Sequence, residues 1–148
     1  MAEQNQEERR HIRRLPAAEL NVEWRPRKGL FNRFQPAEGQ DFTRNGLSVS
    51  LNSGESLEIG DPVELRIELV MEAGMLHLDR VAAVVRNIRE TDNDKPRYGL
   101  EFDFGASRAM KSDQTRAQLG RMEGILERSE KLKLRIQPLQ EIDSLRRS

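Results

Sequence analysis

Three arginines near the N-terminus have the clearest chemical potential in this chain. Arg10 and Arg14 stand four residues apart, and Arg9 directly precedes them. A guanidinium is a permanently charged, planar fork of N–H donors that matches phosphate oxygens or a guanine edge in bidentate fashion. Its flat face also stacks on a nucleobase. This spacing therefore suits a ligand that carries both phosphates and purines.

A second polar group follows at Asp41, Thr43 and Gly46. A carboxylate only accepts hydrogen bonds, so Asp41 suits the N1–H and N2–H₂ donor edge of guanine. Thr43 adds a hydroxyl, and Gly46 lets the backbone bend or a ligand approach closely. The two groups together offer cationic forks, an acceptor and exposed backbone, which is the complement of a guanine nucleotide.

Each group taken alone has a plainer explanation. A run of arginines is more often a solvated basic arm, or a loose contact with RNA or a membrane. A short acidic turn more often simply precedes a strand. The occurrence of both groups in this order favours a nucleotide site.

Composition favours one charged, compact domain. The chain has 148 residues, of which 34% are charged and 36% hydrophobic, enough for a single core. The formal net charge of zero argues against a general nucleic-acid binder. Positive charge is nevertheless concentrated in residues 9–46, which hold nine basic and four acidic residues.

Several classes of protein find no support in the sequence. Cysteine is absent, which excludes disulfides and thiolate metal sites. His77 and Asp79 are too few ligands for a metal site, and no arrangement of residues suggests an enzyme. The polar N-terminus and the lack of a long apolar run predict a cytoplasmic protein without a membrane span.

Alternating apolar and polar residues predict a series of β-strands. One begins at Leu20, and others cover residues 47–51, 63–71, 76–88 and 98–104. The alternation slips between Leu78 and Val81, which predicts a β-bulge or a strong bend. Residues 25–40, with their prolines, glycines and basic side chains, predict a long loop.

The pattern changes to a helical one near the C-terminus. Apolar residues from about 108 to 134 recur at helical spacing. Ser107 or Ser112 could cap its N-terminus, and Pro138 is expected to limit its extent. Five or six short strands followed by a helix indicate a mainly β fold, an antiparallel barrel or sandwich with a C-terminal helix.

In this order and spacing, the RxxxR element at Arg10 and Arg14 and the DxTxxG turn at residues 41–46 resemble the ligand signature of the PilZ family. Members of that family are bacterial receptors for cyclic di-GMP. Further short stretches, at residues 60–67, 81–86 and 97–102, are similar to the family's later strands. The resemblance covers roughly residues 8–104.

The resemblance implies a six-stranded antiparallel β-barrel followed by an α-helix, with cyclic di-GMP bound outside the barrel. It assigns ligand binding to six residues: Arg9, Arg10, Arg14, Asp41, Thr43 and Gly46. The family usually has serine where Thr43 stands. No catalytic residue, metal or cofactor is implied. We expect a mobile arm at residues 1–16, the barrel at 17–106, and a C-terminal helix and tail at 107–148.

The expected function is that of a cyclic di-GMP effector in bacterial second-messenger signalling. Ligand binding would fold the arginine arm onto the barrel and alter a surface that an unidentified protein partner reads, in a pathway such as motility or biofilm formation. The C-terminal helix could also form a homo-oligomer. The alternatives are a PilZ-fold adaptor that works by protein contacts without nucleotide, and a weak RNA or single-stranded DNA binder.

Overall fold

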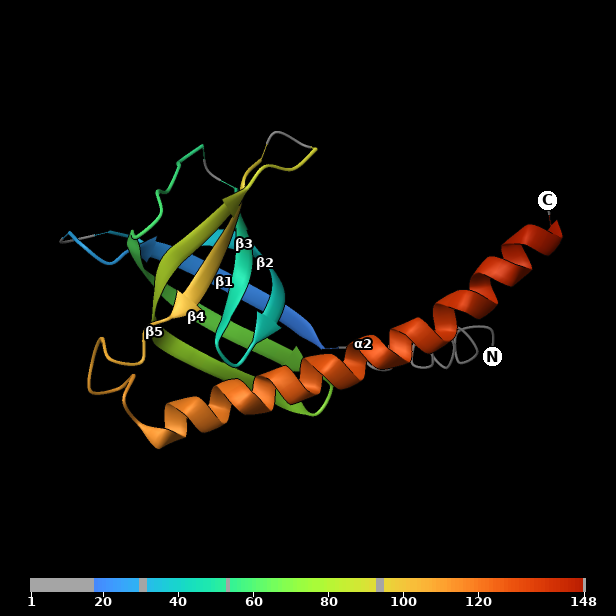
Figure 1. Ribbon diagram of the computed structural model, residues 1–148. Helices are drawn as coiled ribbons and strands as arrows, with labels where there is room; N and C mark the ends of the chain where they lie inside the picture. The colour runs from blue at the N-terminus through green and yellow to red at the C-terminus, as the bar shows by residue number, and fades with distance from the viewer. Residues whose placement is uncertain (1–17, 30–31, 53, 93–94, 148) are drawn as a thin grey trace.

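A computed structural model describes residues 18–29, 32–52, 54–92 and 95–147, with residues 132–147 described by their backbone alone. The chain folds into six strands and a long helix (Figure 1). The elements are β1 (Glu19–Pro26), β2 (Gln35–Thr43), β3 (Gly46–Leu51), β4 (Pro62–Met71), β5 (Gly74–Arg89), β6 (Arg97–Phe102) and α2 (Asp113–Arg147).

The strands form a closed barrel in the order β1-β2-β3-β6-β5-β4, and every neighbouring pair is antiparallel. The first and fourth strands close it, with Glu19 opposite Val70 and Pro26 opposite Val63. Closure leaves no strand edge unpaired. The predicted six-stranded antiparallel barrel with a C-terminal helix is therefore confirmed.

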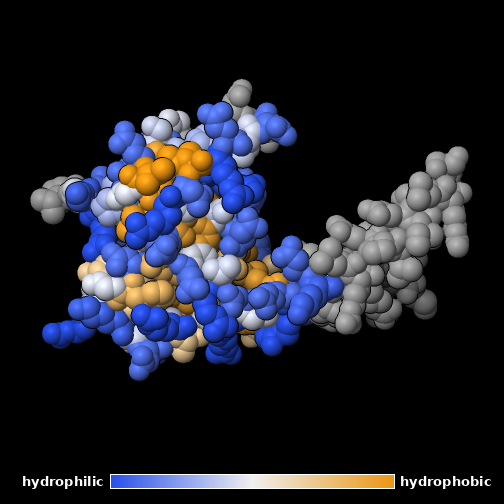
Figure 2. Space-filling view, in the orientation of Figure 1, coloured by the Kyte–Doolittle hydropathy of each residue, from blue (hydrophilic) through white to orange (hydrophobic). Residues whose placement is uncertain are grey.

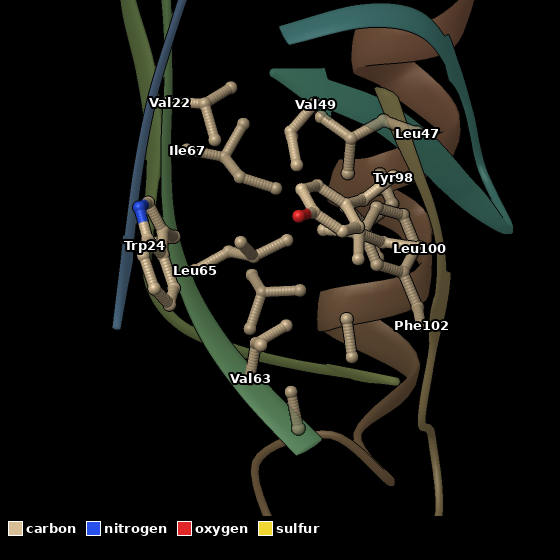
Figure 3. Close-up of a cluster of buried hydrophobic side chains, with 14 of the residues drawn as sticks. Val22, Trp24, Leu47, Val49, Val63, Leu65, Ile67, Tyr98, Leu100 and Phe102 are labelled. Atoms are coloured by element: carbon tan, nitrogen blue, oxygen red, sulfur yellow. The ribbon is translucent and has the colours of Figure 1, made fainter. Parts of the chain in front are cut away.

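The barrel interior holds the core that the alternating residues predicted. The inward positions of β4 are fully buried, and Trp24 and Tyr98 are the largest side chains enclosed. Figure 3 shows these side chains converging between the strands. The Tyr98 hydroxyl accepts the main-chain N–H of Leu57 at 3.1 Å, so it also fastens the loop after β3.

The outside of the barrel is mostly hydrophilic. Figure 2 shows polar side chains over much of this face, interrupted by a hydrophobic patch towards the top of the view. The large hydrophobic side chains most exposed in the described chain are Ile59, Met75 and Ile88.

The predicted loop at residues 25–40 is wrong in part, because β1 continues to Pro26 and β2 begins at Gln35. Few apolar residues mark β2, whose sequence is largely polar, so periodicity does not reveal it. Its strand conformation is instead imposed by pairing with β1 and β3. A side chain at Gly39 would lie 2.7 Å from Val22 Cγ2, so glycine lets β2 pass over the core.

The predicted irregularity in the fifth strand is confirmed. The register of β4 and β5 shifts between the pairs Leu65–Val81 and Ile67–Leu78. The hairpin between these strands turns through Glu72 and Ala73. The bulge reconciles the two apolar phases, so that Leu76 and Leu78 before it and Val81 and Ala83 after it all pack against the core.

The C-terminal helix begins at Asp113, later than predicted, after a series of turns. Its cap is Ser112, whose hydroxyl accepts the N–H of Gln114, while the Ser107 hydroxyl accepts that of Met110 one turn earlier. The helix continues past Pro138 to Arg147, so the expected limit was wrong. A proline costs about 3 kcal/mol in a helix interior, which bends or weakens a helix without always ending it.

The first half of α2 packs on the barrel. Leu119 and Met122 are fully buried, and Ile125 and Leu126 pack against the same core. The turns that precede α2 are tied to the end of β1 by a hydrogen bond. The Arg27 guanidinium donates it to the Ala106 carbonyl at 3.1 Å. No helix in the described part of the chain is long and apolar enough to cross a membrane.

Candidate ligand site beside the β2–β3 turn

Asp41 occupies a strained position just before the β2–β3 turn. The register of these strands shifts between Gln40 and Thr43, so two residues of β2 oppose one of β3. Asp41 takes a φ of 53° in this bulge. Aspartate and asparagine tolerate the left-handed conformation better than other side chains, which explains a polar residue here. The bulge turns Asp41 outward, where its side chain is 72% exposed.

Thr43 fixes the shape of the turn itself. Its hydroxyl accepts the N–H of Asn45 at 3.1 Å and donates to the Gly46 carbonyl at 3.3 Å. A side-chain hydroxyl that bonds the backbone two residues later is a common turn device. The hydroxyl thus has a local structural role in addition to any contact with a ligand.

Gly46 permits a close approach between strands. A Cβ on this residue would overlap the carbonyl oxygen of Leu100 on β6. The Asn45 carbonyl also accepts the N–H of Phe102 at 2.8 Å, which joins the turn to the same strand. The glycine is therefore required by packing against β6, whereas the sequence suggested a bend or an approach by ligand.

An open cavity of about 290 Å³ lies on the outside of the barrel beside this turn. All three described residues of the predicted site line it. Its other lining residues come from the turn and from β3, β5 and β6: Asn45, Leu47, Ser48, Arg86, Asn87, Gly99, Leu100 and Glu101. The structure thus brings Asp41, Thr43 and Gly46 together around one concave surface.

A second bulge forms the opposite wall of the cavity. The register of β5 and β6 shifts between Val85 and Asn87, which leaves Arg86 as the extra residue. The Asn87 amide lies over Gly99, where any side chain on the glycine would collide with it. Bulges redirect side chains and are common beside functional sites. Two of them here aim polar groups at one surface.

The charges around the cavity almost cancel. Its lining holds two carboxylates, Asp41 and Glu101, and one guanidinium, Arg86. Arg86 lies 3.5 Å from Glu101, and Arg97 lies 3.9 Å from Asp41. The described wall therefore has hydrogen-bonding groups for a base but no excess positive charge for phosphates.

The other predicted ligand residues, Arg9, Arg10 and Arg14, lie outside the described residues. Sequence reasoning also missed the cavity residues of β5 and β6. The sequence contained one indication of them. Asn87 follows Ala83 and Val85 at the two-residue spacing of inward-facing positions, and a polar residue at such a position indicates an irregularity in the strand.

Among the basic residues of the predicted loop, Arg25 makes contacts with the barrel wall. Arg25 donates to Glu64 at 2.5 Å, and both Arg25 and Arg66 lie 4.2 Å from the centre of the Phe34 ring. Such cation–π contacts add modestly to stability. His77 is exposed, and the described residues contain no group of three or more potential metal ligands.

Comparison with known proteins agrees with this architecture. The PilZ domain family model matches residues 7–122. Among solved structures, the PilZ domain with c-di-GMP of YcgR from Escherichia coli is similar, with 17% identity and a TM-score of 0.51 over 80% of this chain and 95% of that chain.

A second similar structure is the inhibitor of motility (MotI/DgrA) of Bacillus subtilis. It has 19% identity and a TM-score of 0.48, over 83% of this chain and 52% of that chain. The search of curated proteins found no match. The family model covers most of the sequence, from the arginine element through the barrel into α2, and the chain belongs to the PilZ domain family.

Proposed function

We propose that this protein is a cyclic di-GMP receptor that signals by a change in conformation rather than by catalysis. The observation that carries the proposal is the geometry of Asp41. Its carboxylate is held outward by a left-handed residue in a bulge, at the wall of an open cavity. Strained residues persist where the surrounding structure imposes them, and they are often functional.

The cavity suits one guanine of the ligand. Asp41 offers an acceptor for the N1–H and N2–H₂ edge, and Asn87 and Ser48 add polar groups on the same surface. A volume of about 290 Å³ is at the lower end of ligand clefts, which usually range from about 300 to 1,000 Å³. The described wall would therefore cover one side of the ligand and leave the other open.

The near-neutral wall explains why arginines from elsewhere are needed. A ligand with two phosphates brings two negative charges to a surface whose own charges cancel. Arg9, Arg10 and Arg14 would supply the missing positive charge and close over the open side, as bidentate donors to phosphate. Ordering of the arm against the barrel is the conformational change that we propose a protein partner reads.

Titration calorimetry with cyclic di-GMP tests the proposal, with GTP and the linear dinucleotide as controls. Wild-type protein is expected to bind the cyclic dinucleotide selectively at micromolar concentration or below. Arg14→Ala should abolish most of the heat while changing the free energy of unfolding by less than about 0.5 kcal/mol, because the proposal gives this arginine a role in binding and none in the barrel core.

An absence of binding by the wild type, checked by an optical method, would overturn the receptor proposal and leave an adaptor that acts through protein contacts. Binding that is strongly dependent on salt and equally tight for any nucleic acid would instead favour an RNA or single-stranded DNA binder. Full binding by Arg14→Ala would show that the arm does not contribute.

A further inference from the structure

Glu123 on α2 forms two hydrogen bonds with Arg44, which lies in the β2–β3 turn. The Glu123 carboxylate accepts the main-chain N–H of Arg44 at 2.8 Å, and it also accepts the Nε–H of the same residue at 2.8 Å. Figure 1 shows the β2–β3 turn lying directly against α2 at this point. One carboxylate thus holds both the backbone and the side chain of one turn residue.

The chemistry of this contact is that of a fixed ion pair. Hydrogen bonds to Arg44 hold the pKa of the Glu123 carboxyl below its ordinary value of 4.5, the main-chain bond having the largest effect. The Glu123 side chain is only 15% exposed, although that of Arg44 is 63% exposed. Hydrogen bonds to an ionised acceptor are stronger than neutral ones. The carboxylate is therefore charged and engaged near neutral pH.

Packing on either side fixes Glu123 in place. The preceding residue, Met122, is fully buried against the barrel, and Ile125 packs partly against the same core. Gly120 lies one turn earlier in the helix, and a Cβ added to it would lie 3.9 Å from the guanidinium carbon of Arg44. The helix backbone at Glu123 can therefore move away from the turn only if these apolar contacts also change.

The same turn faces the ligand cavity on its other side. Thr43 and Asn45 line the cavity, whereas Arg44 between them is bonded to α2. Asp41 depends on the same short segment, because the bulge that directs it outward ends at Thr43. A shift of the turn towards or away from α2 would therefore change the shape of the cavity wall.

We propose that Glu123 is a positioning residue for the ligand site, which couples the docking of α2 to occupation of the cavity. This inference rests on the proposed function, since it assigns a further residue to the same site. The docked helix holds the turn in the shape that the ligand requires. By reciprocity, a bound ligand favours the docked helix.

The sign of the effect separates this role from simple electrostatics. Glu123→Gln removes a negative charge near an anionic ligand, so charge alone predicts equal or tighter binding. A positioning role predicts weaker binding, because the two N–H groups of Arg44 meet different carboxylate oxygens and glutamine replaces one of these with an NH₂ donor. Glu127→Gln is the matched control, since Glu127 is an exposed residue one turn further along α2.

Calorimetry of the full chain with cyclic di-GMP makes the test. Glu123→Gln is expected to weaken binding about fivefold to tenfold, at the lower end of the usual range of coupling between sites. Glu127→Gln should bind as the wild type does. Arg44→Ala should also weaken binding, and the double variant should lose little more than Glu123→Gln alone, because Glu123→Gln already disrupts the side-chain bond that Arg44→Ala removes.

Hydrogen exchange supplies a second readout that does not depend on affinity. In the wild type, cyclic di-GMP should slow amide exchange in residues 116–131 of α2, and Glu123→Gln should reduce that protection. If Glu123→Gln fails to fold, the exchange measurement on the wild type decides the matter, because no ligand effect on α2 exchange would overturn the inference.

The outcomes of these experiments are distinguishable. Wild-type binding, together with unchanged or tighter binding by Glu123→Gln and no ligand effect on α2 exchange, would overturn this inference alone. No binding by the wild type would overturn the proposed function and this inference with it. Equal weakening by Glu123→Gln and Glu127→Gln would show a general effect of the helix surface and would also overturn it.

Discussion

The guanidinium of Arg97 on β6 reaches past β3 to lie 3.9 Å from the carboxylate of Asp41 on β2. The intervening strand pairs with both neighbours, through Ser48 opposite Gln40 and Ser50 opposite Arg97. This long ion pair links the two walls of the cavity. It also balances the carboxylate that we propose recognises guanine.

Arg97→Met is expected to weaken cyclic di-GMP binding about threefold to fivefold, the size of an exposed ion pair. Loss of the guanidinium leaves the cavity wall with a net negative charge, which opposes an anionic ligand. Calorimetry at two salt concentrations measures the change. Arg80→Met, at an exposed position elsewhere on β5, is the control. Equal losses in the two variants would contradict a specific role for Arg97.

Substitutions at Asp41 should separate backbone conformation from ligand recognition. Asp41→Asn is expected to retain stability, since asparagine also tolerates a positive φ, but to lose ligand affinity about tenfold or more, because the amide replaces one of the two acceptor oxygens with a donor. Asp41→Ala should additionally lower the free energy of unfolding by about 1 kcal/mol. Urea denaturation and calorimetry on the same samples measure both quantities. Undiminished binding by Asp41→Asn would remove the carboxylate from the site.

Gly46→Ala should lower the free energy of unfolding by about 1–3 kcal/mol, the usual effect of overpacking. Its Cβ would collide with the Leu100 carbonyl, and a backbone atom between paired strands has little room to move. Gly54→Ala is the matched control, because a Cβ there would meet no atom within 4 Å. If thermal denaturation shows equal stability for the two variants, β3 and β6 are less closely packed than described.

The Glu123–Arg44 contact predicts a specific dependence of stability on pH. A carboxyl whose pKa is lower in the folded state stabilises that state above its unfolded pKa, and this contribution is lost as the pH falls through the folded value. The stability difference between wild type and Glu123→Gln should therefore be largest above pH 4.5 and shrink below it. Urea denaturation of both proteins across this pH range measures the difference. The other carboxylates are the same in the two proteins, so their effect on stability cancels in the comparison. A difference that grows on acidification would contradict the contact.

Strands with strong periodicity could be predicted from the sequence alone. Alternation in β4 predicted that its hydrophobic residues lie inside, and the slip after Leu78 predicted the bulge in β5. The order and spacing of the two polar groups led to the PilZ family and to Asp41, Thr43 and Gly46. Local patterns suffice here because side-chain period and turn chemistry are properties of neighbouring residues.

Other features could not be predicted in this way, because they depend on contacts between residues far apart in the chain. β2 is a strand through its partners, although its own sequence resembles a loop. Gly46 serves a close approach to Leu100, and Arg44 meets Glu123 seventy-nine positions later. Barrel closure and helix docking create these contacts. These contacts form the walls of the cavity and join it to α2. The spacing of residues in the sequence does not predict them.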